Sequence, residues 1–277
     1  MVPVAELPAY LSPSSASSFD GCPRRWKFKY VDRLPEPSGE AALIGSFAHL
    51  VLEHLCQLQA PERTLDAAKT LARALWGEFE TDEDYLALEL DGDDSRAFRW
   101  NAWQCIAGLW TLEDPANVDV ISTEEKVRTT LGEVPFVGII DRVDQINDEL
   151  VVTDYKSGTL PGIRWRDDKI QQVLLYAAAL QEETGEMPRS ARLIYLKQSI
   201  VDIAVTQTKL DEAIGQLEGT WTALGHACES DEFEAKPGVL CGWCPFADRC
   251  PEGRAELTRR EAAGKLPAHA PARSLVA

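Results

Sequence analysis

The chain has 277 residues, 45% of them hydrophobic, which is enough for one large domain or two small ones with a real core. Its net charge of −17 argues against a protein that coats nucleic acid by bulk electrostatics, but not against a local basic channel, because charges are screened beyond about 10 Å. No run approaches the roughly 20 apolar residues of a membrane span, and no secretory signal is evident, so we expect a cytoplasmic protein without membrane contact. In that reducing compartment the seven cysteines suggest metal ligands more than disulfides.

The first predicted element is a helix over residues 13–31, after a serine-rich N-cap. Phe19, Trp26 and Tyr30 are expected along one side of it. Residues 22–33 carry a net charge of +4, from Arg24, Arg25, Lys27, Lys29 and Arg33 against Asp32. This basic run is either an ordinary solvated helix face or a strip that contacts phosphate groups.

Three further helices are predicted before the first strand. An apolar helix over 41–59 follows a loop at 35–40, and it carries His49 and Glu53 one turn apart. His49 is either a core residue or a metal ligand. Helices over 62–80 and 94–113 flank an acidic segment, which we expect to be a solvated loop because its acids lack the spacing of a calcium-binding loop. Four residues of the later helix are expected in the core: Trp100, Cys105, Trp103 and Trp110.

The second half of the chain alternates strands and helices. Strands are predicted over 118–130, 134–143, 149–156, 191–198 and 200–206, with turns at 131–133 and 147–148 and helices over 165–184 and 209–229. This order predicts an α/β fold with a mixed sheet flanked by helices and an added helical region. We expect a single domain over 1–263, with a helical part at 13–113, an α/β core at 114–230 and a disordered tail at 264–277.

Charged residues close two neighbouring strand-like runs. Asp141 ends one run and Asp154 the other, and Lys156 shares a strand face with Asp154. Two acids and a lysine at strand ends suit a divalent metal beside a water, although a solvated sheet rim with a surface ion pair is the alternative. Glu124 and Glu125 lie on the preceding strand, where one of them could approach the metal, although a solvent-facing position is expected.

The segment 236–250 is a dense ligand loop with the pattern C-x2-C-x5-C, formed by Cys241, Cys244 and Cys250. Three thiolates leave one position open on a tetrahedral metal or a four-iron cluster. Cys22 begins a Cys-Pro dipeptide, as Cys244 and Cys250 do, and is the best fourth ligand. The three remaining cysteines fall inside predicted helices and read as small hydrophobic residues: Cys56, Cys105 and Cys228.

Together these motifs resemble the RecB-like branch of the PD-(D/E)XK nuclease superfamily, over roughly residues 12–250. The iron–sulfur members are the most similar: AddB-type nuclease domains and the CRISPR-associated RecB-like exonucleases. The resemblance rests on the joint order of the motifs and on the split cysteine set. The matching segments are GSFAHLVLE with His49, GIIDRVD with Asp141, TDYKSG with Asp154, Tyr155 and Lys156, and QVLLY with Gln172 and Tyr176.

The resemblance implies a restriction-endonuclease-like sheet and a metal-dependent DNA nuclease, with an exonuclease expected. Mg²⁺ or Mn²⁺ would be bound by His49, Asp141, Asp154 and the carbonyl of Tyr155, and Lys156 would orient the attacking water. Gln172 and Tyr176 would position the lysine or the strand. A [4Fe–4S] cluster is implied on Cys22, Cys241, Cys244 and Cys250, with zinc on the same thiolates as the alternative. Arg24, Arg25, Lys27 and Arg142 are candidates for contacts with the DNA backbone.

Two other functions stay open from the sequence. The chain could be a non-cleaving DNA-binding or scaffold subunit of a helicase–nuclease complex, since its acidic balance makes a partner that delivers DNA attractive. It could also be a nuclease that trims DNA during CRISPR adaptation. An intact set of His49, Asp141, Asp154 and Lys156 argues against an inactive subunit.

Overall fold

The fold is taken from a computed structural model that describes residues 5–162 and 167–276. It divides into two compact units, one formed by residues 1–37 with 216–277 and the other by residues 38–215. The sequence predicts a single domain over 1–263. The structure shows two units because the start of the chain associates with the segment after residue 215 rather than with the residues that directly follow it.

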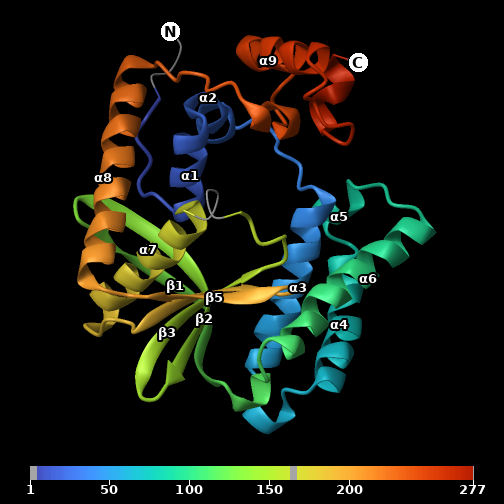
Figure 1. Ribbon diagram of the computed structural model, residues 1–277, viewed down its shortest axis with the longest axis vertical. Coiled ribbons are helices and arrows are strands. Elements are labelled where there is room, and N and C mark those ends of the chain that lie inside the picture. The colour runs from blue at the N-terminus through green and yellow to red at the C-terminus, as the bar shows by residue number, and fades with distance from the viewer. Residues whose placement is uncertain (1–4, 163–166, 277) are drawn as a thin grey trace. The chain divides into compact units, whose positions relative to one another are not determined.

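The unit formed by residues 38–215 contains a five-stranded mixed sheet in the order β1-β2-β3-β4-β5 (Figure 1). All neighbouring strands pair antiparallel except β3 and β4, which are parallel and are joined through helix α7 (Asp167–Thr184). The expected mixed α/β sheet is therefore confirmed. The strands are β1 (Asp119–Leu131), β2 (Val134–Ile146), β3 (Glu149–Lys156), β4 (Ser190–Tyr195) and β5 (Ser199–Ala204).

Both predicted hairpin turns are present. Leu131 pairs with Val134, so Gly132 and Glu133 form a two-residue turn, and Gly132 has a φ of 57°. The second turn is formed by Asn147 and Asp148, whose φ angles are 52° and 63°. Two left-handed residues in sequence match the twist of an antiparallel hairpin, and Asn and Asp tolerate that conformation better than most residues.

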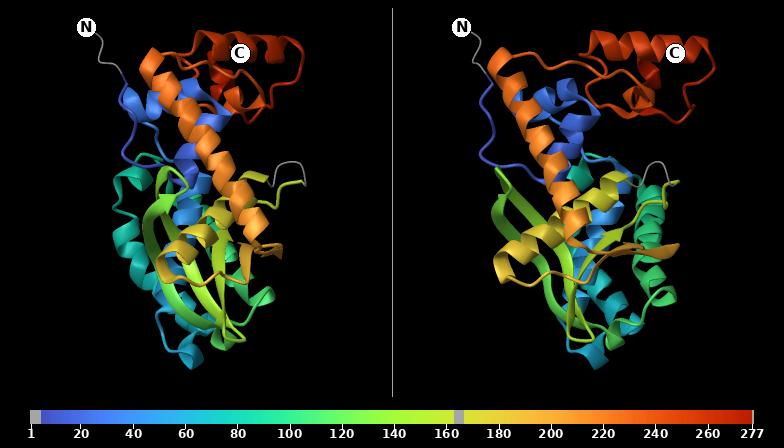
Figure 2. Two further views of the ribbon diagram at one scale, coloured as in Figure 1. Left: turned by 90° about the vertical axis from the view of Figure 1, so that its left-hand side faces the viewer. Right: turned by 60° about the vertical axis from the view of Figure 1, so that its left-hand side comes forward.

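Helices cover the two sides of this sheet. Helix α7 packs against β1, β2, β3 and β4, whereas α3 (Glu40–Cys56) lies on the other side, where it contacts β1 and β2 (Figure 2). Helices α4 (Leu65–Phe79) and α6 (Gly92–Gly108) pack against α3. The start that we predicted for α7, at residue 165, lies outside the described residues. The short elements are η2 (Ala60–Glu62), α5 (Glu83–Leu86), η3 (Leu109–Thr111) and η4 (Pro115–Asn117).

The main core of this unit joins the helices to the sheet. Buried side chains from α3 and α6, such as Phe47 and Ile106, pack in one cluster with Tyr155 of β3 and Ile194 of β4. Burial of this apolar surface stabilises the unit and holds α3 in place beside the sheet.

Two expectations for the helical layer were wrong. Trp100 is 61% exposed, because it lies beside the buried stripe of α6 rather than on it. The acidic segment is not wholly a loop, since it contains α5, which Asp82 caps by accepting a hydrogen bond from the Asp84 N–H at 2.9 Å. This short helix forms because Tyr85 is buried against Phe98, with ring centroids 5.1 Å apart.

The other unit contains the N-terminal helices and the C-terminal segment. The predicted helix over 13–31 is interrupted at Cys22, which has an extended backbone because the following residue is proline. It consists of α1 (Pro13–Gly21), α2 (Pro23–Trp26) and a π-helix η1 (Lys27–Val31). The three aromatic side chains that we expected along one side are grouped around Trp26, whose ring lies 5.9 Å from that of Phe19 and 5.2 Å from that of Tyr30.

The end of the chain differs from the expected disordered tail. After α9 (Pro251–Ala262), Leu266, Ala270 and Ala272 are buried in a small cluster with Leu257, and residues Pro271–Leu275 form the 3₁₀-helix η7. This segment is rich in Pro and Ala and has few apolar residues. They are enough to order it because they pack against helix α9. Two elements complete the chain: α8 (Gln207–Ser230), which crosses the boundary between the units, and η6 (Val239–Trp243).

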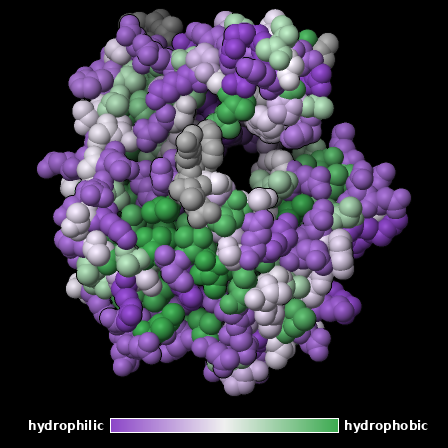
Figure 3. Space-filling model, in the orientation of Figure 1, coloured by the Kyte–Doolittle hydropathy of each residue, from purple (hydrophilic) through white to green (hydrophobic). Residues whose placement is uncertain are grey.

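The surface fits the composition. In the face shown in Figure 3, hydrophilic residues predominate and apolar residues gather mainly over α7 and the sheet beside it. Within residues 5–162 and 167–276, no helix has both the length and the hydrophobicity that a membrane crossing requires.

Candidate active site

Three carboxylates lie side by side across the first three strands. Arg142 of β2 pairs with Thr153 of β3, and the ladder between these strands ends there, so Asp141 and Asp154 occupy the next position on each strand. On β1, Glu124 lies between residues that pair with Arg142 and Ile140, which puts it opposite Asp141. The sequence predicts that Asp141 ends its strand. In the structure β2 continues to Ile146, so Asp141 lies within the strand rather than at its end.

Helix α3 brings His49 to these carboxylates. Its buried residues Phe47, Val51 and Leu52 fix the helix in the core, and His49 extends from a different side of it. The His49 Nδ1 lies 3.4 Å from Asp141 Oδ2. Burial by itself would lower the pKa of His49, but the hydrogen bond and negative charge of Asp141 outweigh it and raise that pKa.

Glu124 faces this cluster, contrary to the expectation that it faces solvent. Its backbone has a φ of 49°, an uncommon left-handed conformation for a non-glycine residue inside a strand. Burial, together with the charges of Asp141 and Glu53, raises the pKa of its carboxyl to about 7. The turn at residues 131–133 sets the register between β1 and β2, and this register places Glu124 next to Asp141. The turn was predicted from the sequence, so the sequence contained a signal for the position of Glu124.

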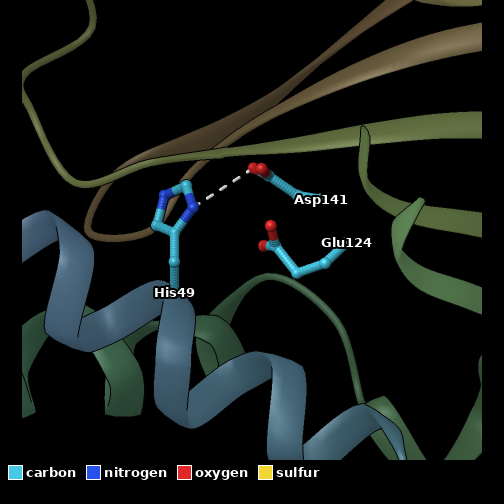
Figure 4. A group of neighbouring side chains, drawn as sticks. All are labelled: His49, Glu124 and Asp141. Carbon is cyan, nitrogen blue, oxygen red and sulfur yellow. Dashed lines mark ion pairs between the residues drawn. The ribbon is translucent and has the colours of Figure 1, made fainter. Parts of the chain in front are cut away.

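His49, Glu124 and Asp141 together are suited to binding a divalent cation. They are the one group of three such side chains in the described residues whose donor atoms all lie within 4.8 Å of one another, and they point toward one another from α3, β1 and β2 (Figure 4). Two carboxylates and one imidazole are ligands that Mn²⁺ accepts readily, and carboxylates also suit Mg²⁺. The raised pKa of Glu124 reflects its burial first and then the negative charge of its neighbours, which a cation would relieve, so the residues fit a metal.

Asp154 lies beside this group and forms an ion pair with Lys156, as predicted from their shared strand face. Its Oδ2 is 2.6 Å from Lys156 Nζ, and the residue is only 2% exposed. Burial raises the pKa of Asp154 to about 6, and the nearby Asp141 acts in the same direction against the lysine. Asp154 is not one of the three residues within 4.8 Å of one another. Metal ligation by Asp154 therefore stays a prediction.

A hydrogen-bonded chain positions Lys156. The ammonium group donates to Gln172 Oε1 at 3.1 Å, and Gln172 Nε2 donates to the Tyr176 hydroxyl at 3.1 Å. Tyr176 fits closely against Gly138 of β2, where an added Cβ would lie 2.7 Å from the tyrosine ring. The structure therefore brings Gln172 and Tyr176 together with Lys156, and it shows why a glycine is needed opposite the tyrosine.

The site opens into a pocket of about 1000 Å³. Besides His49, Glu124, Asp141 and Lys156, it is lined by Lys169 of α7. Burial and the neighbouring charge of Lys156 lower the pKa of Lys169. We did not anticipate Lys169 from the sequence, because only the packing of α7 on the sheet brings it near Lys156.

Tyr155 has two distinct contacts. Its backbone N–H donates to Asp141 Oδ2 at 2.7 Å, which orients that carboxylate. Its hydroxyl points into the core and accepts a hydrogen bond from Arg142 at 2.6 Å. The predicted role of its carbonyl as a metal ligand remains a prediction.

Arg142 is not a contact for the DNA backbone, so this expectation was wrong. Its side chain is fully buried and lies 2.7 Å from both Glu113 and Asp144. The basic residue next to Asp141 is therefore part of the core. A guanidinium group without exposed surface cannot reach a phosphate, and here it neutralises two buried acids.

The other predicted phosphate contacts belong to the unit formed by residues 1–37 and 216–277. Arg25 forms an ion pair with Glu36 and Lys27 one with Asp231, each at 2.6 Å. Arg24 Nε donates to the Phe233 carbonyl at 2.8 Å. The charges of this strip are thus largely engaged within the protein, and phosphate binding by it stays a prediction.

All four predicted cluster ligands line one small cavity in that same unit: Cys22, Cys241, Cys244 and Cys250. Backbone N–H groups donate to the sulfurs of Cys22 and Cys241 at 3.4 Å and of Cys250 at 3.3 Å. Burial raises the pKa of the Cys244 and Cys250 thiols. Of the other cysteines, Cys56, Cys105 and Cys228 are buried, as expected for small apolar side chains.

The spacing of the cysteine sulfurs is relevant to the kind of metal site that they could form. A single tetrahedral zinc ion with bonds of about 2.3 Å keeps its sulfurs about 3.8 Å apart. Within the described residues, no three of the cysteine sulfurs lie within 4.8 Å of one another. The N–H donors suit thiolate ligands, and a multi-iron cluster or a zinc ion at these cysteines stays a prediction.

Two solved structures are similar to the chain. The crystal structure of a protein from Eubacterium rectale named as a candidate exonuclease superposes with a TM-score of 0.55 at 16% identity, over 87% of each chain. That similarity shows the fold alone. The crystal structure of SSO0001 matches 87% of this chain and 85% of its own, with 13% identity and a TM-score of 0.37.

No curated protein sequence matches the chain. The model of the PD-(D/E)XK nuclease superfamily, however, matches residues 10–251, which is most of the chain. The protein belongs to the PD-(D/E)XK nuclease superfamily.

Proposed function

We propose that this protein is a Mg²⁺- or Mn²⁺-dependent DNA nuclease of the RecB-like branch, acting as an exonuclease. One observation carries the proposal. His49, Glu124 and Asp141 form a compact ligand group in one open pocket, which Lys156, the partner of the buried Asp154, also lines. A carboxylate-rich metal site with an adjacent ammonium group is well suited to the hydrolysis of a phosphodiester.

His49, Glu124 and Asp141 would hold the metal, with Asp154 as a further candidate. When bound, the ion would lower the pKa of a water molecule and neutralise charge on the scissile phosphate. The hydrogen bond from the Tyr155 N–H keeps the Asp141 carboxylate oriented toward His49.

Lys156 would act directly on the substrate. Asp154 and Gln172 hold its ammonium group at 2.6 and 3.1 Å, and this restricts the lysine to one position at the pocket wall. From there it can orient the attacking water and stabilise negative charge that develops on the phosphate. Lys169 would add a second positive charge for a non-bridging oxygen.

The four cysteines would hold a [4Fe–4S] cluster that ties Cys22 to the segment after α8. The four cysteines line one cavity, which supports a shared metal site, and zinc is the alternative to the cluster. Protein purified without oxygen should be brown, with a broad visible absorbance that dithionite bleaches. A colourless protein with stoichiometric zinc would contradict the cluster.

The decisive experiment is a cleavage assay on end-labelled single-stranded and duplex DNA with Mg²⁺, Mn²⁺ or EDTA. We expect metal-dependent release of short products by the wild type and no cleavage by Asp154→Ala, which should remain folded by circular dichroism. If neither metal supports cleavage by the wild type, the chain is instead a non-cleaving DNA-binding subunit. Internal nicking of circular DNA would contradict the exonuclease assignment.

A further inference from the structure

A second groove in the unit of residues 38–215 has no role in the proposed hydrolysis. It lies between α4 and α6, both of which pack against α3 (Figure 1), and has a volume of about 440 Å³. Only Phe47 of α3 lines it, whereas the catalytic pocket uses Ser46, His49 and Glu53 on a different side of that helix. The other lining residues are Lys69, Ala72, Arg73, Trp76, Arg99, Trp100, Trp103 and Ile106.

Tryptophan supplies the surface of this groove. Trp100 is 61% exposed, which is unusual for so large an apolar side chain, and Trp103 is half-buried one turn further along α6. Trp76 forms the floor, and the Arg99 guanidinium lies 5.3 Å from the centre of its ring. An exposed indole beside a cation suits a flat π-system that stacks on it.

The charge of the groove is opposite to that of the chain around it. Residues 62–94 contain eleven acids and three bases. Two of those three bases, Lys69 and Arg73, line the groove one turn apart, and the third, Arg63, is buried. Arg99 adds a third positive charge, and no acid is among the lining residues.

These cations are available to a ligand. In the part of the chain that the structure describes, Lys69, Arg73 and Arg99 form no ion pair, whereas Arg25 and Lys27 of the N-terminal strip are paired with acids. Unpaired cations interleaved with tryptophans are the composition of a surface that binds single-stranded nucleic acid. Bases stack on the rings and phosphates contact the cations.

We propose that the groove between α4 and α6 binds a single strand of nucleic acid. Trp100 and Trp103 stack against unpaired bases, and Lys69, Arg73 and Arg99 contact the phosphates. This site retains a strand that is separate from the scissile phosphate, and it would do so whether or not the strand is cleaved.

The test measures binding, in EDTA so that nothing is hydrolysed. Full-length protein is titrated into a labelled oligo-dT strand, a duplex of the same length and a glutamate-rich peptide, and anisotropy is followed. Trp100→Ala should weaken binding of the single strand about fivefold or more, since stacking contributes at this level for each base. Arg73→Gln should reduce the slope of log K against log salt by about 0.7, the loss of one contact with a single strand.

Matched controls separate the groove from general surface effects. Leu86→Ala removes an equally exposed apolar side chain on α5, and Arg96→Gln removes an exposed charge on α6 outside the groove. Both should bind oligo-dT as the wild type does. The proposal is overturned if the groove variants match these controls, if the duplex is bound as tightly and is as sensitive to Trp100→Ala, or if the acidic peptide displaces oligo-dT at equal concentration. Loss of cleavage with groove-dependent binding intact would count against the nuclease assignment alone.

Discussion

Glu124 and Asp141 lie directly opposite each other on antiparallel neighbouring strands, and both carboxylates face His49. Like charges placed in this way repel each other, and the cost is visible in the pKa of Glu124, which burial and its acidic neighbours raise to about 7. Such an arrangement destabilises the empty site and favours a bound cation.

Replacing Glu124 by Gln should therefore weaken Mn²⁺ binding at least about 10- to 100-fold, since the loss of a residue that only supports a metal ligand already costs that much. Isothermal titration of the metal measures this directly. Glu125→Gln is the matched control, because Glu125 is next in the same strand but is not part of the ligand group. Equal affinities of the two variants would remove Glu124 from the site.

The affinity for metal should also depend on pH. A ligand must lose its proton before it binds, and Glu124 with a pKa of about 7 is mostly protonated at pH 6. The raised pKa of His49 acts in the same direction. Affinity should therefore fall as pH decreases from 7.5 to 6, and it should fall less steeply in Glu124→Gln. A profile of the variant as steep as that of the wild type would show that another group titrates.

Lys156→Ala should lower kcat by about 100- to 1000-fold, because a preorganised charge at the developing anion contributes on this scale. Gln172→Ala should have a smaller effect, since Asp154 still holds the lysine. Lys126→Ala, an exposed lysine of β1, should leave the rate unchanged. Single-turnover cleavage of an end-labelled strand gives these rates, and a Lys156→Ala rate within threefold of the wild type would remove the lysine from the reaction.

Arg142 should contribute to stability rather than to substrate binding. Arg142→Ala leaves the buried Asp144 without its positive partner and leaves Glu113 only the more distant Arg192, so the free energy of unfolding should fall by about 3–5 kcal/mol. Arg189→Ala, which breaks an exposed pair with Glu149, should lower stability far less, because solvent screens that pair. Urea denaturation of the two variants compares these losses, and equal losses would contradict the buried network.

Cys250→Ala should abolish the visible absorbance and lower the melting temperature, because a partly liganded metal site no longer joins Cys22 to the C-terminal segment. Cys228→Ala tests a cysteine that is also buried but does not line the cavity, and it should keep full iron content. Iron analysis and thermal melts distinguish the two. An unchanged melting temperature for Cys250→Ala would exclude a structural role.

Preferences of residues close in sequence were sufficient to predict much of the unit formed by residues 38–215. The alternation of the strands, the Asn147–Asp148 turn and the spacing of Asp154 and Lys156 predict the β2–β3 hairpin and the ion pair that the structure contains. Each of these depends on residues close in sequence, for which backbone preference and strand period are enough. The sequence pattern also grouped the four cysteines that line one cavity in the structure, and their role as ligands stays a prediction.

Long-range packing decided the rest. Whether Glu124 faces the metal site, whether Arg142 reaches solvent and whether Trp100 is covered depend on which surfaces the helices and strands present to one another. Arg142 illustrates the reason. From the sequence, a basic residue next to Asp141 is predicted to contact phosphate. In the folded protein its charge is neutralised in part by Glu113, which becomes adjacent only when β2 packs against the segment that follows α6. Burial and pairing of charge are properties of the assembled fold, so residue order alone left them open.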